Sequence, residues 1–315
     1  MAKTVVLAFG GNAIIRPGQK GTYEEQKANI QETCRQLVDL VRDGYRLVLT
    51  HGNGPQVGNI LIKNEVAKDV VPPMPLDVLV SDTQASIGYI IQQTLSYELA
   101  RAGLKVPTVS IVTQVVVDPS DPAFQNPTKP IGPFYSEQEA RKLMEEKGYQ
   151  MVEDSNRGWR RVVPSPKPLE IVEKEAVKAL LQAGIIVVAA GGGGIPVVRK
   201  PDGSLEGVEA VIDKDRAARL LASEVGAEFL FLLTEVEQVY LDFGKPTQRA
   251  VSRLTVEEAK KYLAEGQFPP GSMGPKIEAA ISFVEAGGEK AIIGSLSKAA
   301  AAVAGRSGTA VVAGK

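Results

Sequence analysis

The sequence has one cysteine, Cys34, and no long apolar run among its 315 residues. A single cysteine excludes an internal disulfide framework, and the apolar residues at helical spacing around it predict a thiol buried in a core. Residues 1–11 lack the cationic segment and the long apolar run of a signal peptide. No stretch approaches the roughly 20 apolar residues that span a bilayer. We therefore expect a cytoplasmic protein with no membrane partner.

An excess of either charge is also missing. The chain has 36 basic and 37 acidic residues, a net charge of −1, so no overall field attracts nucleic acid. Two common phosphate-binding motifs are absent as well. Gly52 and Gly54 are followed by Val57 where a dinucleotide fingerprint needs glycine, and no Gly-Lys pair precedes serine or threonine. Any recognition of phosphate must therefore depend on local basic groups in another arrangement.

Six short runs are apolar on consecutive residues, which is typical of strands buried on both faces. Helical segments lie between them and have recognisable starts, such as the capping box Thr22-x-x-Glu25 and Pro55 in a first turn. This alternation predicts one α/β domain over residues 1–315, a three-layer α/β/α sandwich around a mostly parallel sheet. The predicted strands are 4–9, 46–50, 108–117, 185–190, 229–234 and 290–294.

Residues 118–168 interrupt the alternation. They contain eight of the 20 prolines around one helical stretch, 136–148, and the only tryptophan, Trp159. A linker seldom has such aromatic and apolar density. We therefore predict a small inserted lid subdomain over 118–168.

Glycine-rich segments follow three of the predicted strands, at 10–13, 51–54 and 191–194. Each alone is most simply a tight turn. Ligands in open α/β folds bind beyond the carboxyl ends of the strands, so three such segments together favour an anion site. His51 has no evident nucleophile or carboxylate partner and is interpreted as a residue that bonds the backbone, not as a base. Asn53 is better suited to hold a small polar substrate through its amide.

Three lysines occupy unusual positions. Lys129 lies between prolines, whereas Lys214 and Lys276 lie at predicted helix starts, where a positive charge opposes the helix dipole. A surface charge would explain each alone, but with the strand-end glycines they predict a phosphate clamp. Asp215 is expected to orient the ammonium groups. A helix-terminal charge, or Mg²⁺ ligation together with Asp213, is the alternative role.

Seven motifs occur in order across nearly the whole chain: GGNA, HGNGPQVG, NPTKPIGPFYS, GWRRVVPSP, GGGGIPV, EAVIDKD and GSMGPK. Together they resemble the carbamate kinases of the amino-acid-kinase superfamily, and the third and fourth are typical of the carbamate kinase insertion. The resemblance implies reversible phosphoryl transfer between ATP and carbamate, with ADP and carbamoyl phosphate as the other pair. It further implies Mg²⁺, a homodimer and a place in arginine metabolism. The direction in which this reaction proceeds in the cell stays open.

By motif position, the resemblance assigns three groups of contacts. The catalytic group is Lys129, Lys214, Asp215 and Lys276. The acceptor and the transferred phosphoryl group would meet Gly10, Gly11, Asn12, Gly52 and Asn53. ATP or ADP would meet Gly192, Thr234, Val236, Tyr240, Met273 and Lys276. No residue is assigned as a metal ligand.

Two other functions stay open. One is a kinase of the same superfamily with a larger carboxylate substrate, and the other is a nucleotide sensor without turnover. A proline-stiffened lid favours a small acceptor, and the retention of four charged groups argues against a sensor. Ala8 departs from the superfamily, where many members have a lysine at that position, and Lys214 or Lys129 would supply the charge. Transfer to an already deprotonated carbamate requires positioning and charge neutralisation but no base.

Overall fold

The structure is a computed structural model that describes residues 2–154, 157–269 and 272–314. An eight-stranded sheet forms its centre, and all neighbouring strands in it are parallel except β16 and β17. In spatial order its strands are β15 (Arg253–Thr255), β17 (Thr309–Val312), β16 (Lys290–Gly294), β12 (Phe229–Leu233), β1 (Thr4–Phe9), β2 (Arg46–His51), β9 (Ile186–Val188) and β3 (Thr108–Ser110).

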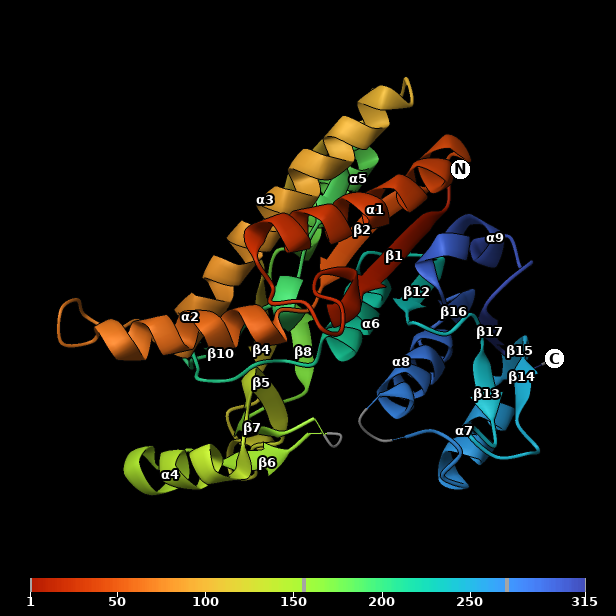
Figure 1. The fold of residues 1–315 in the computed structure, drawn as a ribbon. Helices are drawn as coiled ribbons and strands as arrows, with labels where there is room; N and C mark the ends of the chain where they lie inside the picture. Colours follow the sequence, from red (N-terminus) through yellow and green to blue (C-terminus); the bar gives the residue numbers. More distant parts are fainter. Residues whose placement is uncertain (1, 155–156, 270–271, 315) are drawn as a thin grey trace.

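Helices cover both faces of this sheet (Figure 1). Val5 and Leu7 of β1 pack into one core with α1 (Tyr23–Arg42), α3 (Leu76–Arg101) and α9 (Ala299–Val303). Val6 and Ala8 point to the opposite core, which contains α5 (Lys174–Gln182), α6 (Lys214–Glu224), α7 (Val256–Ala264) and α8 (Met273–Glu285). The predicted three-layer sandwich is confirmed. Consecutive residues of β1 are apolar because each face of the strand meets a helical layer.

Cys34 of α1 lies in the first of these cores, as its helical spacing predicts. Its Sγ is 3.4 Å from the hydroxyl of Thr94 on α3. Burial raises the pKa of the thiol to about 12. The side chain therefore acts as a small apolar residue in the packing of two helices.

The prediction of one strand over 108–117 is wrong. The chain forms β3, leaves the large sheet, and continues as β4 (Gln114–Val117) in a second sheet with β8 (Pro168–Ile171), β10 (Ile195–Arg199) and β11 (Leu205–Gly207). The break is stabilised from outside the segment, because the side-chain oxygen of Gln84 accepts a hydrogen bond from the amide of Thr113 at 2.8 Å. The segment contains no glycine or proline that would predict this break.

Residues 118–167 form a separate unit between β4 and β8. Its sheet joins β5 (Lys129–Tyr135), β7 (Trp159–Val163) and β6 (Met151–Glu153) in antiparallel order, after the short helix η2 (Pro122–Phe124). The predicted helix is confirmed as α4 (Glu137–Lys147), with a capping box at Ser136. In Figure 1 this unit lies below the main sheet, and β5 packs against α2 (Gly54–Ala67).

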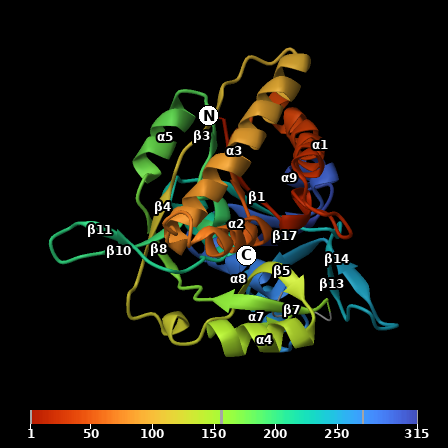
Figure 2. The same ribbon diagram turned by 60° about the vertical axis from the view of Figure 1, so that its left-hand side comes forward.

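The remaining short elements connect these layers. They are η1 (Gly11–Ala13), η3 (Gly191–Gly193), η4 (Leu296–Lys298) and the hairpin of β13 (Val239–Leu241) and β14 (Arg249–Val251). The turned view in Figure 2 shows the β13–β14 and β10–β11 hairpins projecting on opposite sides. Over the described ranges, no helix combines the length and apolar character that crossing a bilayer requires.

Candidate active site

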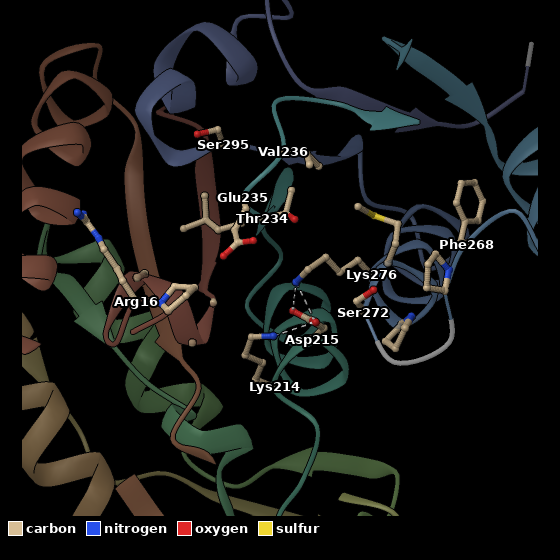
Figure 3. Close-up of a pocket in the computed structure, with 18 of the residues that line it drawn as sticks. Arg16, Lys214, Asp215, Thr234, Glu235, Val236, Phe268, Ser272, Lys276 and Ser295 are labelled. Atoms are coloured by element: carbon tan, nitrogen blue, oxygen red, sulfur yellow. Dashed lines mark hydrogen bonds and ion pairs between the residues drawn. The ribbon is translucent and has the colours of Figure 1, made fainter. Parts of the chain in front are cut away.

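A cavity of about 850 Å³ lies at the carboxyl ends of β1 and β12 (Figure 3). The wall of the cavity includes Gly10 and Gly11, which follow β1 in the chain, and Thr234, which follows β12. The starts of α6 and α8 and part of the 118–167 unit complete the lining. This is the edge of an open α/β sheet where ligands usually bind.

A carboxylate held between two ammonium groups forms the charged centre of this cavity. Asp215 Oδ2 lies 3.0 Å from Lys214 Nζ and 3.1 Å from Lys276 Nζ (Figure 3). Asp215 and Lys276 are almost fully buried, at 3% and 8% exposure. The sequence placed these residues at two helix starts far apart in the chain, and the fold brings them together as predicted.

The environment shifts the pKa values of all three groups. Burial alone would raise the pKa of Asp215, but the charges of Lys214 and Lys276 outweigh it and lower that pKa. Burial lowers the pKa of Lys276, which shares its carboxylate with another lysine. Lys214 is half-buried, which would lower its pKa, but the carboxylates of Asp215 and Asp213 raise that pKa. An incoming anion would add the negative charge that this cluster lacks.

Two helix N-termini lie at the same cavity. Lys214 is the first residue of α6, and Lys276 is the fourth of α8. A lysine there opposes the helix dipole, and Asp215 compensates both lysines locally. Two helix starts and their ammonium groups therefore converge on one place, which is the arrangement of a phosphate site.

Lys129 reaches this cluster from the 118–167 unit. Its Nζ lies 2.6 Å from Asp213 Oδ2, at the start of α6. Both residues line the cavity, and so does Arg157 of the same unit. All four charged residues predicted from the sequence therefore meet at one cavity.

The glycine-rich segments at 10–13 and 51–54 lie at different distances from the cavity. Gly10 and Gly11 line the cavity, whereas the side chain of Asn12 is outside the part that the structure describes. Gly52 and Asn53 are not among the lining residues. A Cβ at Gly52 would lie 3.1 Å from Lys214 Cδ, and the amide of Asn53 donates to the hydroxyl of Thr83 at 2.9 Å. Gly52 thus packs against the stem of Lys214, and Asn53 is held by Thr83 of α3.

The glycine-rich segment at 191–194 packs against the segment at 51–54. Gly192, Gly193 and Gly194 have φ values of 68°, 94° and 86°, which side chains other than hydrogen rarely allow. A Cβ at Gly192 would lie 2.3 Å from the amide nitrogen of Asn53. Gly192 packs on Asn53 and is not among the residues that line the cavity, and its contact with the nucleotide stays a prediction.

His51 is buried beside the same segment. Its Nδ1 is 3.1 Å from the carbonyl oxygen of Gly52, and a Cβ at Gly191 would collide with its ring. Burial lowers the pKa of His51 to about 4. The ring is therefore neutral at pH 7 and packed in place, which agrees with its interpretation as a backbone-bonding residue.

The wall beyond the lysines is less charged. Thr234, Val236, Tyr240 and Met273, which the resemblance assigns to the nucleotide, all line it. The segment 233–240, which the resemblance assigns to the adenine and ribose, also contributes Glu235 to the lining. The sequence did not predict other lining residues, because they stand in loops without periodicity; among them are Arg16, Phe243, Gln267 and Phe268. The rings of Tyr240 and Phe243 are 6.1 Å apart. Figure 3 shows Phe268 and the lysine cluster on the same side of the cavity, with Arg16 opposite.

The described residues contain no group of three His, Cys, Asp or Glu side chains that could hold a metal ion. Asp215 is already shared by two lysines, and Asp213 binds Lys129. Any divalent cation here would therefore need ligands from a substrate. The set suits Mg²⁺, which commonly keeps few protein ligands and binds substrate phosphates.

Comparison with known proteins agrees with this geometry. The sequence profile of the amino acid kinase family matches residues 3–295. The carbamate kinase of Thermococcus kodakarensis is 52% identical over 98% of this chain and 99% of its own length. That of Pyrococcus furiosus is 50% identical over 99% and 100%. The structure of carbamate kinase from Giardia lamblia bound to AMP-PNP has a TM-score of 0.91 at 43% identity, with 99% of both chains covered.

Proposed function

This chain belongs to the amino acid kinase family, and from that premise we propose that its cavity is where a phosphoryl group passes between ATP and carbamate. The chain has the function of a carbamate kinase, an ATP-dependent enzyme that interconverts ATP and carbamate with ADP and carbamoyl phosphate. The observation that carries the assignment of the site is Asp215 held between Lys214 and Lys276 at the cavity wall.

The three lysines stabilise the phosphates by charge. The transferred group carries negative charge on its oxygens, and preorganised cations in a water-poor site stabilise it strongly. Asp215 touches both Lys214 and Lys276, so it holds their ammonium groups in place. Gly10 and Gly11 leave room for the transferred group beside the backbone. Carbamate arrives deprotonated, so no residue has to act as a base.

ATP or ADP occupies the cavity with its phosphates toward the lysines. The base and ribose lie along Thr234, Val236, Tyr240 and Met273, where aromatic and thioether side chains provide apolar contact. Lys276 lies between this wall and the phosphates. The AMP-PNP complex of the Giardia lamblia enzyme supports a nucleotide site in this fold.

Nucleotide phosphates beside Lys214 and Lys276 would hold Mg²⁺. It would neutralise charge on the phosphates, which supply most of its ligands. The residues of this chain contribute by fixing the phosphates through Lys214 and Lys276.

The 118–167 unit acts as the lid on the acceptor side. Lys129 reaches the cavity from it, and Gly52 and Asn53 shape the floor behind Lys214. Closure of such a lid excludes water that would otherwise hydrolyse carbamoyl phosphate. A lid this close to Lys214 favours a small acceptor over the larger carboxylates used elsewhere in the family.

The enzyme assembles as a homodimer through α3. Tyr89 and Tyr97 are more than half exposed on this helix, at 55% and 54%. Ala85 and Ser86 on the same side are exposed as well, and small residues permit close approach of a second helix. The molar mass from sedimentation should match two chains, and Tyr89→Glu should dissociate them.

The proposal extends to a cytoplasmic enzyme of arginine metabolism, as the sequence resemblance implies.

One assay tests the function directly. Purified protein receives MgADP with carbamoyl phosphate, or MgATP with acetylglutamate, aspartate or UMP, and the adenine nucleotides are measured. ATP formation in the first mixture alone is expected. Turnover in a second mixture alone would favour another kinase of the family, and none in either, with ATP still bound, would favour a sensor.

A further inference from the structure

The carboxylate of Asp213 is engaged on both oxygens. Oδ1 accepts hydrogen bonds from the amides of Asp215 and Arg216, at 2.9 and 3.2 Å, and so caps α6. Oδ2 accepts from Lys129 Nζ at 2.6 Å. One side chain therefore joins the helix start that bears Lys214 and Asp215 to the 118–167 unit.

This contact is shielded and charged. The side chains of Lys129 and Asp213 are 26% and 19% exposed, so solvent screens their attraction only in part. Burial would raise the pKa of Asp213, but the charges of Lys129 and Lys214 hold it well below its usual range. Asp213 therefore stays ionised at neutral pH and keeps its attraction for Lys129.

Other links of the 118–167 unit lie outside α6. The amide of Val211 donates a hydrogen bond to the carbonyl oxygen of Pro164 at 2.9 Å, and further contacts are with α2. Lys147 of α4 lies 3.3 Å from Glu65 of α2, and Gly132 of β5 packs against Gly58 of the same helix. These contacts fix the unit against α2. The Lys129–Asp213 pair is instead a link to α6, at the cavity itself.

We propose that Asp213 is a positioning residue that aims the Lys129 ammonium group into the cavity. The inference rests on the proposed function, in which Lys129 meets the phosphates. An ammonium group has three donors, and Asp213 uses one, so the others stay available for substrate oxygens. Because Oδ1 is fixed by the α6 amides, the direction of Oδ2 is set by the helix that also places Lys214. Asp213 thereby holds Lys129 of the lid at a fixed position relative to Lys214 of α6.

A double-mutant cycle separates this role from a structural one. Asp213→Asn retains an oxygen that caps α6 but loses the charge that attracts Lys129. Lys129→Met removes the group through which Asp213 acts. Asp202→Asn is the matched control, because Asp202 lies in the β10–β11 turn and accepts hydrogen bonds from Ser204.

Asp213→Asn should lower kcat for ATP formation by about 10- to 100-fold, as expected when a reacting group is misplaced by about 1 Å. In the Lys129→Met background the same change should alter kcat by less than about threefold, because its effect passes through Lys129. Asp202→Asn should behave as the wild type. An equal loss in both backgrounds, or a wild-type kcat for Asp213→Asn, would overturn the inference.

A second readout does not depend on turnover. The strand β7, which contains Trp159, lies close to the start of α2, because a Cβ added at Gly54 would lie 3.6 Å from Arg160 Nη2. The emission of Trp159 therefore serves as a probe of the lid unit. Acrylamide quenching of Trp159 in the ligand-free protein should rise equally in Asp213→Asn and Lys129→Met. If Asp213→Asn does not fold, Asp213→Ser serves instead, because its hydroxyl can cap the helix without reaching Lys129. Loss of ATP formation in the wild type itself would refute the proposed function, whereas unchanged quenching in both variants would refute this positioning role alone.

Discussion

Gly58 of α2 and Gly132 of β5 pack backbone against backbone, because a Cβ added at Gly58 would lie 1.9 Å from Gly132 Cα. Gly132 also has a φ of 76°, a conformation that favours glycine. The backbone of the lid unit therefore packs directly against the backbone of α2, with no room for a side chain between them. Any added atom must push the unit away, and Lys129 moves with it.

The change Gly58→Ala tests this contact. It should lower kcat by roughly tenfold or more, since displacement of the lid misplaces Lys129. Overpacking should also reduce the free energy of unfolding by about 1–3 kcal/mol. Steady-state kinetics and urea unfolding measure both effects, with the exposed neighbour Asn59→Ala as the control. A folded Gly58→Ala enzyme with wild-type kcat would show that the lid position does not matter for turnover.

Lys214→Ala and Lys276→Ala should each reduce kcat by about 10²-fold or more, by analogy with the removal of other electrostatic donors. Circular dichroism should show that both variants keep the fold. Lys260→Ala is the control, because Lys260 forms a surface ion pair with Glu285 outside the cavity. Near wild-type kcat in either folded cavity variant would remove that lysine from the catalytic group.

Asp215→Asn keeps the shape of the side chain but removes the charge between Lys214 and Lys276. We expect kcat to fall much further than ADP affinity, since Asp215 orients ammonium groups without touching the nucleotide. The buried Lys276 and the half-buried Lys214 would then lack their carboxylate, which should also destabilise the fold by about 3–5 kcal/mol. Isothermal titration with ADP and Mg²⁺ provides the decisive comparison. Equal losses of kcat, ADP binding and Mg²⁺ affinity would point to metal ligation instead.

His51 should make stability depend on pH. Burial lowers its pKa from 6.5 to about 4, so across that window the unfolded chain binds a proton that the folded chain does not. The free energy of unfolding should therefore fall on acidification, by up to about 3 kcal/mol from this residue. Urea unfolding of wild type and His51→Gln at several pH values isolates the effect, because other groups titrate alike in both. Parallel curves would contradict a neutral buried histidine.

Closure of the lid should depend on ligands. The emission of Trp159 should change when MgADP and carbamoyl phosphate bind together, and Lys129→Ala should lower kcat while MgADP binding stays nearly intact. Stopped-flow fluorescence and equilibrium titration measure these effects. Replacement of 118–167, which ends where β8 begins, by a short Gly-Ser linker should abolish turnover. A folded protein with unaltered turnover after this replacement would refute the lid.

The charged centre of the site was predictable because two lysines at helix starts conflict with the helix dipole, and the conflict is visible in the sequence. The strands were predictable where both faces of the sheet are covered. The break after β3 was not, because it depends on Gln84 of α3, whose oxygen accepts from the amide of Thr113. The packing of Gly192 on Asn53 was not predictable for the same reason, since it is a long-range contact.

The burial of Cys34 has a practical consequence. A thiol with a pKa near 12 forms almost no thiolate at neutral pH, so maleimide dyes should leave the folded wild-type protein unmodified. A cysteine introduced at an exposed site on α4, and a second one on α1, would then be the reactive thiols of the chain. Donor and acceptor fluorophores attached there would report the distance between lid and core in single molecules during turnover, with no native cysteine to remove first.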